Sequence, residues 1–161
     1  MENLSFTRWT VKRMTVTFCG HSEITEEAAV QAWLHETVFR LCLQGAKRFL
    51  IGGYGCFDGL AAKTVWRVKS LFPEVSSVLV LPYLNRDVDM ALYDHSLYPP
   101  LENVPRRYAI VKRNEWMVTE ADVVVAYVLH SWGGASRTYE YAARKGKTII
   151  SFEDRKKRND R

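Results

Sequence analysis

With 161 residues, the chain has the length of one ordinary domain, and its 47% hydrophobic and 25% charged residues are typical of a globular protein. This composition excludes a disordered or a fibrous protein. The formal net charge of +5 depends largely on residues 155–161, which carry five basic residues and one acidic residue. We therefore expect a single domain over residues 1–154 and a disordered basic tail over residues 155–161, and this distribution argues against nucleic acid as a partner.

The three cysteines, Cys19, Cys42 and Cys56, have no Cys-x-x-Cys spacing and lie among apolar residues. Such cysteines are typical of reduced, buried thiols rather than of disulfides or a zinc site. The sequence has no signal-like segment at its N-terminus and no apolar run of membrane-spanning length. We expect a cytoplasmic protein that contacts no membrane and holds no metal or cofactor.

Short β-branched runs alternate with stretches of helical periodicity, which is typical of parallel β-α-β units. In chain order, the predicted elements are a strand over 14–19, a helix over 25–44, a strand over 49–51, a helix over 61–72, a strand over 78–81, a short helix over 113–119, a strand over 122–128, a helix over 139–145 and a strand over 148–151. The pattern predicts a three-layer α/β fold of Rossmann type, with a mainly parallel sheet of about five strands and helices on both faces.

Two segments of this pattern carry more specific expectations. Thr25 is the predicted N-cap of the first helix, and Gly45 is its predicted end. The connection over residues 83–108, rich in proline and tyrosine, is long for a compact domain, and such connections are more often functional than accidental.

Three glycine-bearing turns each follow a predicted strand. They are Gly20-His21-Ser22, Gly52-Gly53-Tyr54-Gly55 and Gly133-Gly134-Ala135-Ser136. Phosphate binding needs accessible backbone N–H groups, which glycine provides, and the start of a helix adds positive potential. Because turns that leave the carboxyl ends of parallel strands lie on one edge of the sheet, we expect all three to form one anion-binding crevice.

Familiar motifs for phosphate, metal and nucleophile chemistry are absent from the sequence. It contains neither the Gly-x-Gly-x-x-Gly pattern of dinucleotide binding nor a P-loop, and its histidines lack metal-ligand spacing. Asp58 has two interpretations, a helix cap or an acceptor for a ribose hydroxyl. His21 also has two, a donor to a phosphate or a turn histidine bonded to backbone.

Arg113 and Glu140 flank the fourth predicted strand. Arginine can bind a phosphate with two hydrogen bonds, and a glutamate beside a sugar can stabilise positive charge or activate water. A structural ion pair is the simpler interpretation. A set of aromatic residues near the crevice has two interpretations as well, stacking on a base or packing in the core or a dimer interface: Tyr93, Tyr98, Tyr108, Trp116 and Trp132.

Several of these motifs together resemble the SLOG superfamily, and specifically its YpsA-like branch. The stretches that carry the resemblance are Phe18-Cys19-Gly20-His21, Gly52-Gly53-Tyr54-Gly55-Cys56-Phe57-Asp58, Tyr98-Pro99-Pro100-Leu101-Glu102, Arg113-Asn114-Glu115-Trp116-Met117 and Ser131-Trp132-Gly133-Gly134-Ala135. The resemblance implies a Rossmann-like fold that binds nucleotides or nucleotide-derived ligands. More distant relatives are the "lonely guy" phosphoribohydrolases and the Rossmann domain of the DNA-processing protein.

The phosphoribohydrolases have an arginine four residues before a methionine and, after the next strand, a Gly-Gly-x-Gly-Thr-x-x-Glu motif. Arg113 stands four residues before Met117, and the segment 133–140 keeps the spacing from glycine to Glu140. The resemblance therefore implies Arg113 and Glu140 as catalytic residues.

Within that motif, Ser136 and Arg137 replace the glycine and threonine of the enzymes. The side chains of Ser136, Arg137 and Thr138 are accordingly expected to contact phosphate. YpsA-like proteins often have arginine after Gly-His, where this chain has Ser22.

The leading hypothesis is a module that binds a nucleotide or another phosphorylated small molecule. The first alternative is an enzyme that hydrolyses the N-glycosidic bond of a nucleotide, and the second is a nucleic-acid-binding protein. A homodimer is expected only from the resemblance.

Overall fold

The computed structural model of the protein describes residues 13–84 and 87–159, with side chains described up to Arg155. Its strands are β1 (Met14–Gly20), β2 (Ala46–Ile51), β3 (Ser76–Val80), β4 (His95–Leu97), β5 (Val123–Tyr127) and β6 (Thr148–Ser151). Its helices are α1 (Glu27–Leu43), α2 (Gly55–Val68), a 3-10 turn (Arg106–Tyr108), α3 (Ala109–Glu120), α4 (Gly134–Arg144) and α5 (Phe152–Asn159). The strands form one sheet in the order β4-β3-β2-β1-β5-β6, in which every neighbouring pair is parallel.

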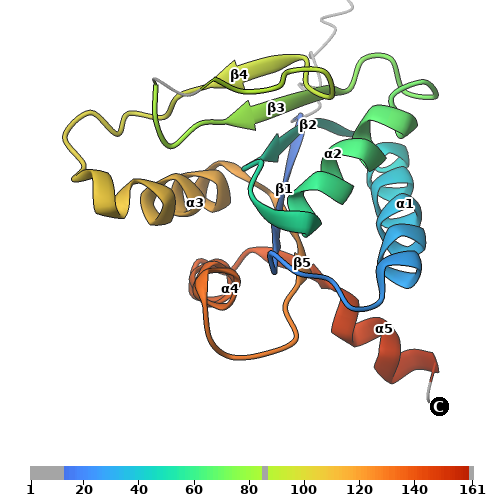
Figure 1. Cartoon of the computed structure of the whole chain (residues 1–161). Coiled ribbons are helices and arrows are strands. Elements are labelled where there is room, and N and C mark those ends of the chain that lie inside the picture. The colour runs from blue at the N-terminus through green and yellow to red at the C-terminus, as the bar shows by residue number, and fades with distance from the viewer. Residues whose placement is uncertain (1–12, 85–86, 160–161) are drawn as a thin grey trace, which may run out of the picture.

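Helices cover both faces of this sheet, as Figure 1 shows, with α1, α2 and α5 on one side and α3 and α4 on the other. The alternation of side chains along β1 produces these layers. Val16 and Phe18 belong to the core under α1 and α2, whereas Cys19 belongs to the core under α3 and α4. The three-layer α/β fold expected from the sequence is therefore confirmed, with six strands rather than about five.

The additional strand, β4, lies inside the connection 83–108. It escapes periodicity analysis because it has only three residues, and His95 and Ser96 are both exposed. Hydrogen bonds position it instead: the Asp94 carboxylate accepts the Ser77 N–H at 2.8 Å, and the Asp94 N–H donates to the Ser77 carbonyl at 2.9 Å. Polar contacts between Asp94 and Ser77 thus position an edge strand that the hydrophobic pattern of the sequence does not predict.

The helices begin and end differently from the sequence expectation. The prediction that Thr25 is the N-cap of the first helix is wrong, because Glu26 is the N-cap residue of α1. Helices α2 and α4 begin at Gly55 and Gly134, several residues earlier than expected, since each starts within its glycine turn. Glycine has low helix propensity, so propensity alone places these starts too late.

The basic C-terminal segment is helical in the part that the structure describes, where a disordered tail was expected from residue 155. Helix α5 continues to Asn159, and residues 160–161 lie outside the described ranges. Phe152 is buried and packs against Trp33 and Tyr127, with ring centroids 5.3 and 5.4 Å apart. This anchor ties the start of α5 to the core. None of the helices in the described ranges is long and apolar enough to cross a membrane.

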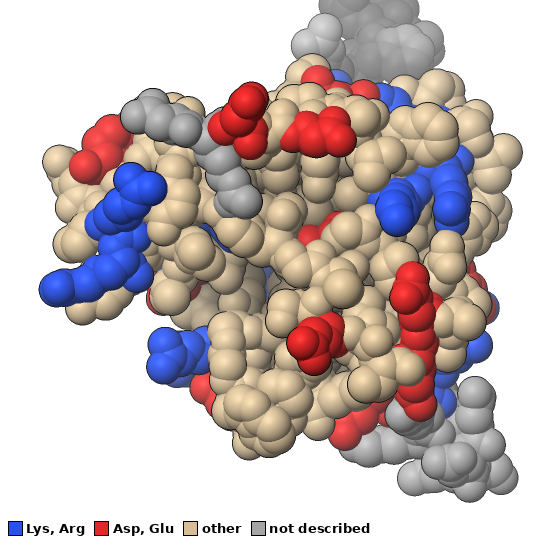
Figure 2. Space-filling model, viewed as in Figure 1, with Lys and Arg blue, Asp and Glu red and all other residues tan. Residues whose placement is uncertain are grey.

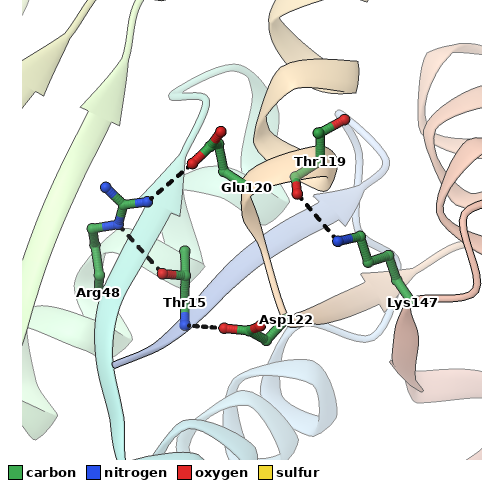
Figure 3. Close-up of polar contacts among 6 residues, drawn as sticks. All are labelled: Thr15, Arg48, Thr119, Glu120, Asp122 and Lys147. Atoms are coloured by element: carbon green, nitrogen blue, oxygen red, sulfur yellow. Dashed lines mark hydrogen bonds and ion pairs between the residues drawn. The ribbon is translucent and has the colours of Figure 1, made fainter. Parts of the chain in front are cut away.

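The amino edge of the sheet is held together by polar contacts (Figure 3). The Thr15 N–H donates to the Asp122 carboxylate at 2.9 Å, and the Asp122 N–H returns a bond to the Thr15 carbonyl at 2.8 Å. The Arg48 guanidinium reaches the Thr15 hydroxyl at 3.4 Å and lies 3.6 Å from the Glu120 carboxylate. These contacts join the start of β1 to its two neighbours, β2 and β5.

Replacement of Asp122 by alanine should lower the free energy of unfolding by about 1–2 kcal/mol, because the Thr15 N–H loses its acceptor. Urea unfolding measures the change. The matched control is Glu120→Ala, which removes only an exposed ion pair and should cost less than about 0.5 kcal/mol. Equal losses in the two variants would contradict the assignment.

Candidate functional site

The order of the strands places a crevice beside β1. From β1 the chain first builds the sheet outward through β2, β3 and β4, and then returns to place β5 on the other side of β1. Ligands of open parallel sheets bind at such a reversal, outside the carboxyl ends of the strands. A pocket of about 680 Å³ lies there, and Figure 2 shows the surface of this face hollowed.

Most of the expected site residues line this pocket. They are Gly20, His21, Ser22, Tyr54, Gly55, Asp58, Arg113, Gly133, Gly134, Ala135 and Thr138. The residues expected at the site that lie outside the lining are Gly52, Gly53, Ser136, Arg137 and Glu140. All three glycine turns therefore contribute to one pocket. Phosphate binding by these residues stays a prediction.

The first two turns touch each other because of their glycines. A Cβ on Gly20 would lie 2.2 Å from Cδ1 of Phe57, so a larger residue would displace this buried ring. Gly55 has a φ of +83°, and a Cβ there would lie 2.6 Å from the Cα of Ser22. The Cys56 N–H then donates to the Ser22 carbonyl at 2.9 Å. Both glycines thus serve the contact between the turn after β1 and the turn after β2.

The third turn forms the start of α4. Gly133, the N-cap residue, has a φ of +91° and no side chain that could cover the amide groups of the first helical turn. The Cys19 thiol lies 3.1 Å from the Ala135 carbonyl and joins this turn to the end of β1. The amino end of an eleven-residue helix therefore opens on the pocket, with its dipole favouring an anion.

Arg113 forms the floor of the pocket and is only 1% exposed. Its Nη1 donates to the carbonyls of Gly52 and Val80, at 2.8 and 2.7 Å, and its Nε donates to the Asn114 amide oxygen at 2.9 Å. The guanidinium also lies over the Tyr54 ring, 5.1 Å from its centroid. Much of its donor capacity is thus directed at the carboxyl ends of β2 and β3.

Asp58 lies close to this guanidinium across Gly52. A Cβ on Gly52 would lie 3.1 Å from Cζ of Arg113 and 3.2 Å from Oδ2 of Asp58, so a larger residue would fit there only if one of these side chains moved by a few tenths of an ångström. The Asp58 carboxylate accepts the Tyr54 N–H at 3.0 Å, which satisfies an amide at the start of α2. Asp58 itself lies inside the first turn of α2 and the N-cap residue is Tyr54, so the interpretation of Asp58 as the residue that caps the helix is wrong. Burial raises the pKa of Asp58 to about 7, and the charge of Arg113 offsets this only in part.

His21 is bonded to backbone. Its Nε2 accepts the Leu129 N–H at 2.8 Å, which requires an unprotonated nitrogen. Burial and the neighbouring His130 lower the pKa of His21, in agreement with a neutral ring. Of the two interpretations of this residue, the turn histidine is confirmed for one nitrogen, and donation to a phosphate stays a prediction.

Glu140 and Arg113 do not line the same pocket. Glu140 is exposed and lines a neighbouring hollow of about 250 Å³ between α3 and α4, together with Arg137 and Arg144. Ser136 is buried in the first turn of α4. The catalytic pair implied by the resemblance stays a prediction, now with its members in two adjoining hollows.

The pocket lining includes residues that the sequence patterns did not assign to the site. Among the lining residues that the structure describes, the charged side chains are Glu23, Asp58 and Arg113, and aromatic rings come from His130 and Trp132 after β5. The sequence signal for these rings is their position, directly before the third glycine turn. Within residues 13–84 and 87–159, no group of His, Cys, Asp or Glu has an arrangement that could hold a metal ion.

Solved structures share this architecture. DNA processing protein A from Streptococcus pneumoniae matches with a TM-score of 0.63 and 15% identity, over 87% of this chain and 50% of that one. The protein of the same name from Helicobacter pylori, whose structure concerns single-stranded DNA binding, matches with a TM-score of 0.61 and 15% identity, over 86% and 64%. The molybdenum cofactor binding protein from Rippkaea orientalis matches with a TM-score of 0.60 and 19% identity, over 88% and 77%.

The chain has the same fold as the matching domains of these proteins. It spans about half to two thirds of the length of the two DNA-processing proteins. No protein-family model and no curated protein matches the sequence. The expected Rossmann-like fold is confirmed, and membership of the SLOG superfamily and of its YpsA-like branch stays a prediction.

Replacement of Arg113 by methionine should lower the free energy of unfolding by about 3 kcal/mol, because two buried carbonyls lose a charged donor. Chemical denaturation measures this loss. Arg137→Met serves as the control, since Arg137 is exposed on α4, and its effect should stay within about 0.5 kcal/mol. Similar stabilities of wild type and Arg113→Met would show that the fold does not depend on the Arg113 hydrogen bonds.

Asp58 should make stability depend on pH. Because its pKa is higher in the folded chain than the ordinary value of 3.8, the folded state binds more protons, and stability falls as the pH rises from 3.8 to about 7. Asp58→Asn should therefore match wild type near pH 4 and exceed it by about 4 kcal/mol at pH 8, since each pKa unit corresponds to about 1.4 kcal/mol. Urea titrations at both pH values measure the difference. The prediction is contradicted if Asp58→Asn is less stable than wild type at pH 8.

Proposed function

We propose that the protein binds a nucleotide or a nucleotide-derived phosphorylated ligand at the carboxyl edge of its sheet. The observation that carries the proposal is the meeting of the three glycine turns around one pocket of about 680 Å³. This volume lies within the range of small-molecule sites, which is roughly 300–1,000 Å³.

The phosphate is expected at the start of α4. There the amides of Gly134 and Ala135 border the pocket, and the helix dipole attracts an anion. Because the exposed charges of the lining are few, recognition would rest on backbone donors rather than on a cluster of basic side chains. The molybdenum cofactor binding protein among the structural neighbours supports small-molecule binding in this fold.

Gly134 offers a direct test of this placement. A Cβ at Gly134 meets no atom within 4 Å, so both Gly134→Ala and Gly134→Asp should fold. The aspartate adds a negative charge where the phosphate is expected and also favours the start of a helix. We expect Gly134→Asp to keep or raise the melting temperature of the free protein and to weaken nucleotide binding about tenfold or more.

The measurement is thermal stabilisation by nucleoside mono-, di- and triphosphates, ADP-ribose and cyclic nucleotides, followed by calorimetry of the best ligand. Gly134→Ala is the matched control and should bind nearly as wild type does. If no member of this set stabilises the wild type, the proposed function is wrong. If Gly134→Asp binds as tightly as Gly134→Ala, the phosphate does not lie at α4.

Hydrolysis of an N-glycosidic bond is the second candidate, favoured by the closeness of the hollow that holds Glu140. That hollow shares Asn114, Gly134 and Thr138 with the main pocket. Chromatography of the same nucleotide mixtures for released base, with wild type and Glu140→Gln, decides between binding and turnover. Base release by wild type but not by Glu140→Gln would favour the enzyme.

Nucleic-acid binding has less support. On the face drawn in Figure 2, basic and acidic side chains are interspersed, whereas nucleic-acid-binding surfaces gather positive charge. The expected homodimer and a role for residues 83–108 stay predictions.

A further inference from the structure

Three rings form a continuous stack at the rim of the pocket. The imidazoles of His21 and His130 lie with centroids 3.8 Å apart and planes at 14°, and the indole of Trp132 lies 3.8 Å from His130 with planes at 16°. His21 follows β1, and the other two residues follow β5. The stack therefore spans the two strands between which the crevice opens.

The inner end of the stack is attached to the core. The His21 ring meets Tyr127 edge to face at 5.7 Å, and Tyr127 is buried and stacked on Phe57 at 5.8 Å. The Leu129 N–H donates to Nε2 of His21, which fixes the orientation of the imidazole. These contacts hold the stack in place before any ligand arrives, so little ordering is left to occur on binding.

The outer end of the stack is Trp132, which is 69% exposed, more than any other large hydrophobic side chain of the described residues. An indole gains free energy when it is buried, so the exposed ring of Trp132 offers apolar surface that a ligand could cover. In addition, Nδ1 of His130 is buried without a hydrogen-bond partner among the described residues, and a ligand could supply one.

We propose that Trp132 is the stacking surface for the planar heteroaromatic ring of the ligand. The ring would add a fourth layer to the stack of His21, His130 and Trp132, while the phosphate lies at the start of α4. The two sites are adjacent because Trp132 directly precedes Gly133, the N-cap residue of α4. This inference rests on the proposed function and deepens it, since it names the part of the ligand that the rings recognise.

Stacking on an indole selects flat rings in general and not one pattern of hydrogen bonds, because every base presents a π face. The site should therefore prefer ligands with a heteroaromatic ring over sugar phosphates without one. Among rings, larger purines should bind more tightly than pyrimidines.

The experiment compares AMP, GMP, CMP and UMP with ribose 5-phosphate by calorimetry, using the whole chain. Wild type should bind AMP about tenfold more tightly than ribose 5-phosphate, as expected for one stacked base. Trp132→Ala should lose most of this preference and bind ribose 5-phosphate as wild type does. Trp132→Phe should keep part of it, because a smaller aromatic face remains.

Trp66→Ala is the matched control. Trp66 is 56% exposed on α2 and lines a different hollow, so its removal should leave both affinities unchanged. Because Trp132 is exposed, the melting temperature of Trp132→Ala should stay close to that of wild type.

The outcomes separate this inference from the function on which it rests. If ribose 5-phosphate and the nucleotides bind equally, or if Trp132→Ala weakens both classes to the same degree, the stacking surface is refuted while phosphate binding stands. If neither class binds the wild type, both the proposed function and this inference are overturned. A tenfold preference that disappears only in Trp132→Ala supports the proposal.

Discussion

The buried guanidinium of Arg113 is the interaction on which the carboxyl edge of the sheet depends. A cation taken out of water has to be surrounded by acceptors, and here the carbonyls of Gly52 and Val80 provide them at the ends of β2 and β3. The same group links α3 to the sheet and packs closely against Gly52. An arginine beside a pocket is usually interpreted as a phosphate ligand, but the buried side chain of Arg113 forms the floor of this pocket.

The two edges of the sheet have different chemistry as a consequence of the parallel topology. At the amino edge, Thr15 bonds to both Asp122 and Arg48, and these bonds join neighbouring strands. At the carboxyl edge, helices begin within glycine turns, so backbone amides and rings border an open pocket. Because few charged side chains line that pocket, the proposed ligand would contact mainly the amino end of α4 and aromatic rings.

The enzymatic alternative illustrates what motif spacing leaves undecided. The separation of Arg113 from Met117 and of Gly133 from Glu140 agrees with the phosphoribohydrolases, but spacing in the sequence does not say which hollow of the folded chain each side chain borders. In α4, Gly134 and Thr138 line both the pocket and the adjoining hollow, whereas Glu140 lines the adjoining hollow and not the pocket. A catalytic role for Glu140 would therefore require a ligand that extends from the pocket into the adjoining hollow.

The sequence by itself determined the fold class, the parallel order of β-α-β units, and the three glycine turns, because hydrophobic periodicity and glycine placement are local properties. It did not determine β4, which polar bonds from Asp94 hold in place, or the true start of α2 and α4 within their turns. It also could not bring His21 onto His130, since residues more than a hundred positions apart meet only when β1 and β5 pair. Only the tertiary structure decided which glycines face the pocket, that Arg113 is buried, and that Trp132 is exposed at the rim, because each outcome depends on packing between elements distant in the chain.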